Sequence, residues 1–427
     1  MSDDTLFVNA RQVVTCAGPA RARRGDEMRD AVVRDGVAVH VRSGTIAAVA
    51  PEHELRIEQP RAAIVDCERG VLTPGFVDSH THAVFGRARY EEQELRATGV
   101  PYLEIARRGG GIHASVRDLR ARGEDELLAL ASGRLARLAA SGVTTVEVKS
   151  GYGLSVDAEL RTLRVIRRLG ETLPMRVVPT WMGAHEIPLE HREREQGRRE
   201  YLNLLVREML PAVAAERLAR FADVFCEPGV FTVDEAREVL TAARRAGLGL
   251  KLHADELSAG GGAELAASLG AVSADHLAAV SESGIAALAA AGTVATLLPA
   301  TLLFLGVREQ APARRLVDAG VAVALATDFN PGTSPTTNFP FVLTLGVSQL
   351  RLTVAEVLVA ATVNGAAALG LADRTGQLAP GFSADLALWA IDDVRELPYW
   401  LDAGHCRASW TRGKPCHPRD LALAFQR

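Results

Sequence analysis

The sequence predicts an α/β protein with a (β/α)8 TIM-like barrel and a small β-sandwich domain built from both chain ends. Eight apolar strings in the middle of the chain alternate with helical stretches rich in Ala, Leu and Arg. Both ends instead carry short strings rich in Val, Ile and Thr between polar breaks. A chain of 427 residues has room for a barrel and a small companion domain.

The two ends are expected to form one composite domain. The strings LFVNARQVVT, AVVRDGVAVHV and GTIAAVAP predict strands in the first 70 residues, and TGQLAPGFSADLALWAID predicts a strand–turn–strand unit around Pro380-Gly381. Neither end shows helical periodicity long enough for a helical domain. We therefore expect residues 1–70 together with 376–427 to build the β domain, and residues 71–375 to build the barrel.

The barrel strands are predicted from buried-looking strings, each followed by a stretch with apolar residues at helical spacing. An open doubly wound sheet is the alternative, but it requires a Gly-rich phosphate turn after its first strand, which is absent. The strings are GFVDSH (75–80), VTTVEVKS (143–150), MRVVPTWMG (175–183), ADVFCE (222–227), LGLKLHAD (248–255), AVSADHL (271–277), GTVATLLP (292–299) and VAVALATD (321–328). The first unit also carries a long insertion, 83–125, at the end of the barrel where function resides.

Composition excludes several classes of protein. The net charge of −4 and the mixing of Arg with Asp and Glu indicate no nucleic-acid-binding face. No apolar run is long enough to span a membrane, and the N-terminus lacks the pattern of a secretory signal. Five scattered cysteines without a CxxC motif are typical of reduced thiols, so we expect a cytoplasmic protein.

Arginine supplies nearly all the basic residues, and the only lysines are Lys149, Lys251 and Lys414. Lys149 and Lys251 fall in predicted barrel strands beside segments that carry the chemistry. We expect them to support those strands through salt bridges.

Histidines gather where the predicted strands end. His80 and His82 stand two apart, so both side chains point to one side of an extended strand. His253 lies near the end of the fifth string, and Asp328 ends the eighth. Three imidazoles and one carboxylate suit Zn²⁺, and also Fe²⁺. We expect one divalent metal per chain, Zn²⁺ or Fe, with Zn²⁺ favoured.

Two further residues have the chemistry to handle protons beside such a metal, which lowers the pKa of a bound water toward about 7. Glu256 follows His253 by three residues and could move a proton from water to a leaving nitrogen. His276 lies near the end of the sixth string and could position that water or polarise a carbonyl group.

Together these features resemble the metal-dependent amidohydrolases: a β segment leading into PGFVDSHTH, then His on the fifth and sixth strands and Asp on the eighth. Five longer motifs resemble the imidazolonepropionase family in particular. They are GRARYEEQELRATGVPYLEIARRGGGI (86–112), EVKSGYGL (147–154), GAHEIP (183–188), HADELS (253–258) and ATDFNPGTSPTTNFP (326–340).

The resemblance implies hydrolysis of the ring C–N bond of 4-imidazolone-5-propanoate to N-formimidoyl-L-glutamate, the third step of histidine degradation. It implies His80, His82, His253 and Asp328 as metal ligands. It implies substrate contacts from Arg89, Tyr152, His185, Glu256, Asn330, Gly332 and Thr333. It also implies a homodimer.

These residue types fit the substrate. Arg89 offers a bidentate fork to the propanoate carboxylate. Tyr152 stands between two glycines that allow a sharp turn, and the Asn330–Thr333 turn can present several donors. We expect His185 to hydrogen-bond the ring carbonyl and to stabilise the developing oxyanion. Glu256, His276 and His185 are therefore the predicted catalytic residues.

Binuclear amidohydrolases bridge two metals with a carboxylated lysine on the fourth strand. Here that string ends in Cys226-Glu227 without a lysine, which favours one metal, although Glu227 could also bridge. A purine or pyrimidine aminohydrolase is the nearest alternative, and a barrel that serves only as an interaction scaffold is a more distant one.

Overall fold

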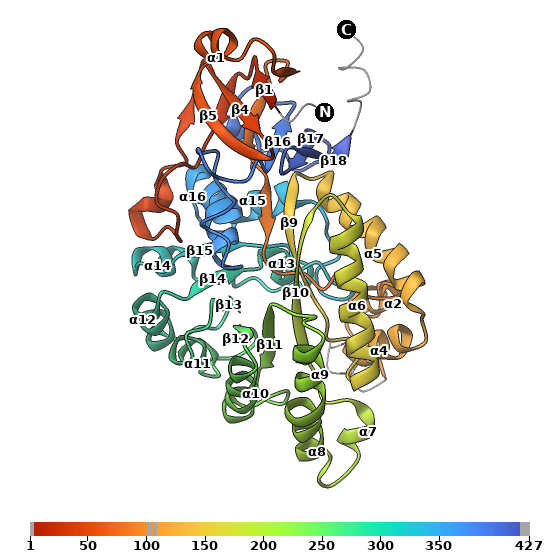
Figure 1. Ribbon diagram of the computed structural model, residues 1–427. Helices are drawn as coiled ribbons and strands as arrows, with labels where there is room; N and C mark the ends of the chain where they lie inside the picture. Colours follow the sequence, from red (N-terminus) through yellow and green to blue (C-terminus); the bar gives the residue numbers. More distant parts are fainter. Residues whose placement is uncertain (1–3, 101–103, 106–108, 419–427) are drawn as a thin grey trace.

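The computed structural model describes residues 4–100, 104–105 and 109–418 (Figure 1). Its centre is an eight-stranded sheet in the order β15-β14-β13-β12-β11-β10-β9-β8, and each paired neighbour is parallel. This confirms the predicted barrel. The strands are β8 (Phe76–Asp78), β9 (Val143–Lys149), β10 (Arg176–Ala184), β11 (Phe221–Cys226), β12 (Gly249–Ala254), β13 (Ser273–His276), β14 (Val294–Leu297) and β15 (Val323–Leu325).

The first and last strands approach each other just beyond their ends. Thr81 forms a parallel bridge with Phe329, His82 N donates to Phe329 O at 2.9 Å, and Asp328 N donates to His80 O at 3.0 Å. The segments that carry the predicted metal ligands therefore also draw the two edges of the sheet together.

Helices surround the barrel strands (Figure 1). In α10 (Val233–Arg245), Thr232 and Glu235 form a capping box, and Ala236, Val239 and Leu240 bury one face. The other helices are α2 (Tyr90–Ala97), α4 (Ile112–Arg120), α5 (Glu124–Ala139), α6 (Val156–Thr172), α7 (Leu189–Arg192), α8 (Gly197–Leu204), α9 (Leu210–Ala215), α11 (Gly262–Ser268), α12 (Glu282–Ala291), α13 (Pro299–Phe304), α14 (Ala313–Asp318), α15 (Phe339–Ser348), α16 (Val354–Val359) and α17 (Gly365–Ala367). No helix in the described residues is long and apolar enough to cross a bilayer.

The chain ends form the predicted β sandwich. A four-stranded sheet, β5-β4-β1-β6, faces a six-stranded sheet, β18-β17-β16-β7-β2-β3, and Phe7 meets Trp410 edge to face between them at 4.9 Å. These strands are β1 (Asp4–Val8), β2 (Gln12–Val14), β3 (Val33–Arg34), β4 (Val37–Arg42), β5 (Thr45–Pro51), β6 (Ala63–Asp66), β7 (Val71–Pro74), β16 (Leu386–Trp389), β17 (Cys406–Thr411) and β18 (Lys414–Pro418). The early segment also contains a short helix, α1 (Glu52–Glu58).

The two chain ends are joined in one sheet: β16 from the C-terminal segment pairs antiparallel with β7 from the N-terminal segment. The predicted strand before Pro380-Gly381 is wrong, since residues 376–380 form no strand. Leu378 N instead donates to Thr15 O at 2.8 Å, and Gln377 accepts from Gly18 N. The turn therefore ties a loop to the N-terminal segment, and β16 takes β7 and β17 as its partners.

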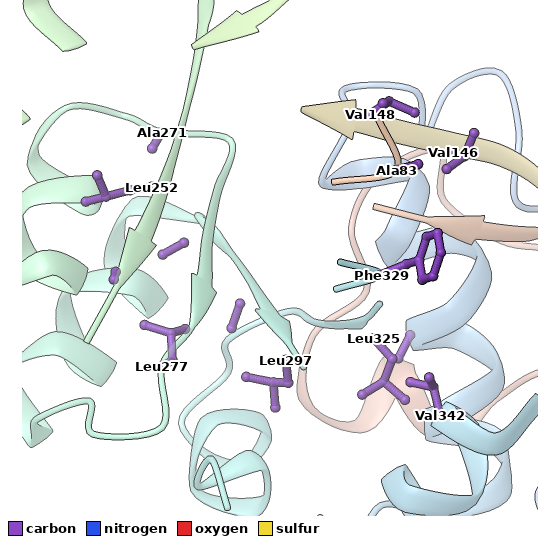
Figure 2. Packing of buried hydrophobic residues seen from close by; sticks show 14 of the residues in the cluster. Ala83, Val146, Val148, Leu252, Ala271, Leu277, Leu297, Leu325, Phe329 and Val342 are labelled. Atoms are coloured by element: carbon purple, nitrogen blue, oxygen red, sulfur yellow. The ribbon is translucent and has the colours of Figure 1, made fainter. Parts of the chain in front are cut away.

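A large apolar cluster packs the helices against the barrel, with Val146, Val148, Leu252 and Leu325 among its members (Figure 2). Val146 and Val148 alternate along β9 with Glu147 and Lys149, and side chains on a strand alternate between its two faces. The packing of the valines in this cluster therefore directs Glu147 and Lys149 to the opposite face, the interior of the barrel.

Candidate active site

The sequence-predicted site residues come together at the carboxyl ends of the barrel strands. His80 and His82 follow β8, His253 lies near the end of β12, His276 ends β13 and Asp328 follows β15. Parallel strands bring these ends to one rim, where barrel enzymes place their chemistry. His276 and Asp328 adopt φ values of +77° and +51°, a left-handed conformation that is costly for residues with a Cβ. Strained backbone of this kind is typical of functional sites, which supports this rim as the site.

The predicted metal ligands form a compact buried cluster. Ligand atoms of His80, His82 and His253 lie within 4.8 Å of one another, and those of His80, His276 and Asp328 do the same. Asp328 Oδ1 lies 3.5 Å from His80 Nε2 and 3.6 Å from His82 Nε2. All five side chains are buried. His276 therefore borders the same small space as the four predicted ligands.

The hydrogen bonds of the imidazoles show that a cation fits this space. His80 Nδ1 donates to Asp275 at 2.7 Å, and His253 Nδ1 donates to Asp223 at 3.0 Å. The Nε2 atom of each ring therefore presents a lone pair. His80 Nε2 is buried without a hydrogen-bond partner, and His253 Nε2 lies only 3.4 Å from His82 Nε2. Nitrogen lone pairs converging beside a carboxylate form the donor set of a divalent metal.

Burial controls the protonation of the cluster. It holds the pKa of His80 well below the usual range, reinforced by the Lys149 ammonium. It lowers the pKa of His82 in the same way, with the neighbouring His185 adding to the effect. Burial also raises the pKa of Asp328 to about 6, although Thr301 donates a hydrogen bond to its carboxylate at 2.7 Å. His80 and His82 are therefore neutral near pH 7, as metal ligation requires.

Glu256 faces the cluster from the segment after β12. Its carboxylate lies 3.5 Å from His276 Nε2. Burial, with the nearby charges of Asp328 and Glu227, raises the pKa of Glu256 to about 8. A carboxyl group poised near neutral pH can both accept and return a proton.

Arg89 is buried against the turn that follows β15. Its backbone N donates to Pro331 O at 3.1 Å, and its guanidinium packs directly on Gly332, where a Cβ would lie 1.3 Å from Nη2. Arg89 Nε and Nη1 are buried without a hydrogen-bond partner, while Glu92 balances the charge at 3.6 Å from Nε. Two unused donors on a buried cation are suited to bind a carboxylate.

The side chain of Asn330 holds this turn together. Asn330 Oδ1 accepts from the backbone N of Gly332 at 2.8 Å and of Thr333 at 2.7 Å. Asn330 Nδ2 donates to Asp328 O at 2.8 Å and thereby joins the turn to a predicted metal ligand.

Tyr152 lies in the loop after β9, which a buried carboxylate holds and which His185, just after β10, contacts. Glu159 accepts from the backbone N of Gly151 at 3.1 Å and of Gly153 at 2.7 Å. His185 Nδ1 donates to Gly151 O at 2.9 Å. Gly151 adopts φ +109°, and a Cβ there would lie 2.9 Å from His185 Nδ1, so this position requires glycine.

This geometry changes the role expected of His185. Burial lowers its pKa to about 3, so the ring is neutral at pH 7. Because Nδ1 carries the proton donated to Gly151, Nε2 is an acceptor. An oxyanion requires a donor, whereas this imidazole can accept an N–H from a ligand.

A cavity of about 820 Å³ connects these groups. Of the residues predicted as ligands, catalysts or substrate contacts, those that line it are His82, Arg89, Tyr152, His185, His253, Glu256, His276, Asp328, Asn330 and Thr333. His113, Glu186 and Arg192 also line it, although the sequence did not single them out for a role. Positions 101–103 and 106–108 of the motif at 86–112 lie outside the described residues.

Sequence reasoning missed the carboxylates behind the histidines. Asp223 and Asp275 are fully buried, and each accepts from the Nδ1 of a predicted ligand. An ionisable residue inside an apolar strand string was the available signal in ADVFCE and AVSADHL. Glu227, considered as a metal bridge, accepts from Leu257 N at 3.2 Å and Ser258 Oγ at 2.5 Å.

Comparison with known proteins agrees with this architecture. Residues 107–417 match the model of the Amidohydrolase family. The chain is similar in structure to an adenosine deaminase from Xanthomonas campestris with bound zinc, at a TM-score of 0.70 and 22% identity, covering 99% of this chain and 95% of that one. A triazine hydrolase variant gives a TM-score of 0.71 at 18% identity, covering 99% and 98%. At these identities the likeness shows the fold.

Sequence comparison is more specific. The imidazolonepropionase of Symbiobacterium thermophilum is 49% identical over 96% of this chain and 96% of its own length. That of Solibacter usitatus is 46% identical over 98% of this chain and 100% of its own length. Since the identity extends over nearly the whole of each chain, the protein belongs to the imidazolonepropionase family of amidohydrolases.

Proposed function

We propose that this chain hydrolyses the ring C–N bond of 4-imidazolone-5-propanoate to N-formimidoyl-L-glutamate, the third step of histidine degradation. One observation carries the proposal beyond family membership. The buried Arg89 lines the same cavity as the cluster that fits a metal. An anion-binding cation beside a hydrolytic centre matches a substrate that carries a carboxylate next to a cyclic amide.

The substrate would lie between the two loops of the site. Arg89 binds the propanoate. The Asn330–Thr333 turn, in which the backbone N of Gly332 and of Thr333 donates to Asn330 Oδ1, packs against the same end of the substrate. Tyr152 contacts the substrate from the opposite loop, and His185 Nε2 accepts a ring N–H. These contacts fix the ring with its carbonyl group toward the histidine cluster.

His80, His82, His253 and Asp328 would hold a divalent metal, which would lower the pKa of a water in the site toward about 7. Glu256 takes a proton from the attacking water as the oxygen of that water bonds to the ring carbonyl carbon. His276 stabilises the charge that develops on the carbonyl oxygen. When the C–N bond breaks, Glu256 returns the proton to the ring nitrogen. One water is consumed: its oxygen and one hydrogen complete a carboxyl group, which ionises at neutral pH, and its other hydrogen forms the N–H.

We propose a single metal per chain, with Zn²⁺ favoured over Fe. Three imidazoles and one carboxylate complete a four-ligand set, and the hydrogen bonds of Glu227 to Leu257 and Ser258 occupy the carboxylate considered as a bridge. Elemental analysis of purified protein is expected to give one equivalent per chain, and two equivalents would overturn this assignment.

We also propose a cytoplasmic homodimer, as the family resemblance implies. Cys16, Cys67, Cys226 and Cys416 are free thiols, which fits a reducing compartment. Sedimentation equilibrium would test the dimer, and a monomer mass at micromolar concentration would contradict it.

Turnover of the substrate by protein of known metal content tests the function. With imidazolone propanoate made in situ from urocanate, metal-loaded protein is expected to remove the imidazolone absorbance, whereas chelator-treated protein is not. Restoring Zn²⁺ should restore the rate. Metal-loaded protein that leaves the chromophore intact but releases ammonia from purines or pyrimidines would refute the proposal in favour of an aminohydrolase.

A further inference from the structure

The interior of the barrel contains a layer of buried charges for which the proposed reaction has no direct use. Its members are Glu147, Lys149, Asp223, Lys251 and Asp275, all fully buried. Barrel interiors are usually filled by Val, Ile and Leu, and an unpaired charge there is strongly destabilising. Two of the three lysines of the chain lie in this layer. The layer therefore calls for a role that apolar side chains could not fill.

Lys149 lies at the centre of the layer. Its Nζ is 2.7 Å from Asp223 Oδ2, 2.8 Å from Glu147 Oε2 and 3.7 Å from Asp275 Oδ2. These carboxylates come from β9, β11 and β13, so a single ammonium group connects three strands of the barrel.

Two of the three oxygens around Lys149 also hold imidazoles. Asp223 Oδ2 also accepts from His253 Nδ1 at 3.0 Å. Asp275 Oδ2 also accepts from His80 Nδ1 at 2.7 Å. Each of these oxygens therefore stands between the ammonium and a predicted metal ligand, and the position of Lys149 bears on two of the four ligands.

We propose that Lys149 is a positioning residue for the metal centre: by fixing Asp223 and Asp275, it sets the ring orientation and tautomer of His253 and His80. The inference rests on the metal site of the proposed function, and it does not depend on the identity of the substrate. Groups behind metal ligands typically change metal affinity by about 10- to 100-fold when they are removed.

Lys251 provides a matched control in the same layer. Its Nζ donates to Ser273 Oγ at 2.6 Å and to Ala368 O at 3.3 Å, and lies 3.5 Å from Asp275 Oδ2. Among the ion pairs of the described residues, Lys251 has none with Asp223, the partner of His253. Replacing Lys251 removes the same charge from the same interior. It leaves the connection from Lys149 through Asp223 to His253 untouched.

The experiment measures the Zn²⁺ dissociation constant by chelator competition for the full-length wild type, Lys149→Met and Lys251→Met, without substrate. We expect Lys149→Met to weaken zinc binding by about 10- to 100-fold and Lys251→Met to weaken it less. The visible absorption of Co²⁺-loaded protein gives a second readout, because its bands report ligand geometry, which a mere loss of stability would not change. Lys149→Met is expected to alter these bands.

The double variant Lys149→Met/Glu147→Gln covers the case in which the single variant does not fold, because it removes one charge of each sign. It retains Asp223 and Asp275 and is expected to show the same weakened binding. A dissociation constant within twofold of the wild type in a folded Lys149 variant, or an equal loss in Lys251→Met, overturns the proposal. Since no substrate is present, a wrong assignment of the reaction would leave these results unchanged.

Discussion

Gly332 allows Arg89 to occupy its place in the site, and Gly332→Ala tests this directly. The added Cβ would lie 1.3 Å from Arg89 Nη2 and 2.2 Å from Cζ. Carbon contacts are normally about 3.5 Å, so the guanidinium would have to move by about 2 Å. Its side chain can swing away at small cost in stability. The position of the cation, and with it the binding of the carboxylate, is what changes.

The magnitude follows from the bonds that are lost. A hydrogen bond to a charged group contributes about 1.5–3 kcal/mol. Losing one of the two hydrogen bonds from Arg89 to the substrate carboxylate therefore lowers kcat/KM by roughly 10- to 150-fold. Most of the change should appear in KM, because the propanoate is bound alike in the ground and transition states. Steady-state kinetics with imidazolone propanoate measures both constants.

Gly133→Ala is the matched control. Gly133 lies within α5, where a Cβ meets nothing within 4 Å, so the same substitution should leave the kinetics unchanged and slightly favour the helix. A Gly332→Ala enzyme with kcat/KM within threefold of the wild type would refute the placement of Arg89 on the substrate.

Three further outcomes are expected. Glu256→Gln should retain its metal and lose about 10²- to 10⁴-fold in kcat; near-normal turnover with metal bound would exclude Glu256 as the proton carrier. Glu159→Leu removes the acceptor of the backbone N–H groups of Gly151 and Gly153, so KM should rise about tenfold or more while zinc content stays constant, and steady-state kinetics with metal analysis checks this. Burial, with the neighbouring Arg192 and Arg117, lowers the pKa of His113 from 6.5 to about 4. Between these values the unfolded chain takes up a proton more readily, so stability is lost as pH falls from 6.5 to 4, by at most about 3 kcal/mol. Urea unfolding at pH 7 and pH 4.5 should show a smaller loss for His113→Gln than for the wild type, and an equal loss would contradict the assignment.

Local pattern predicted the barrel because its signals repeat over short distances. Buried strings and helical spacing gave eight strands near their observed bounds. Because strand ends mark the functional rim, His80, His82, His253 and Asp328 were expected to meet there; they lie in one cluster, and their role as metal ligands stays a prediction. The strand before Pro380-Gly381 failed because Leu378 bonds to Thr15, a contact that no local pattern encodes.

The sequence by itself determined the architecture, the residue types of the site and the family, since each depends on short-range periodicity or on motifs. Only the tertiary structure decided which groups meet. His80 and Asp275 are 195 positions apart and become partners through the register of the barrel strands. The same register places Lys149 between two carboxylates and turns His185 into an acceptor. Hydrogen bonds act over about 3 Å, so roles that depend on them are fixed only when the strands are aligned.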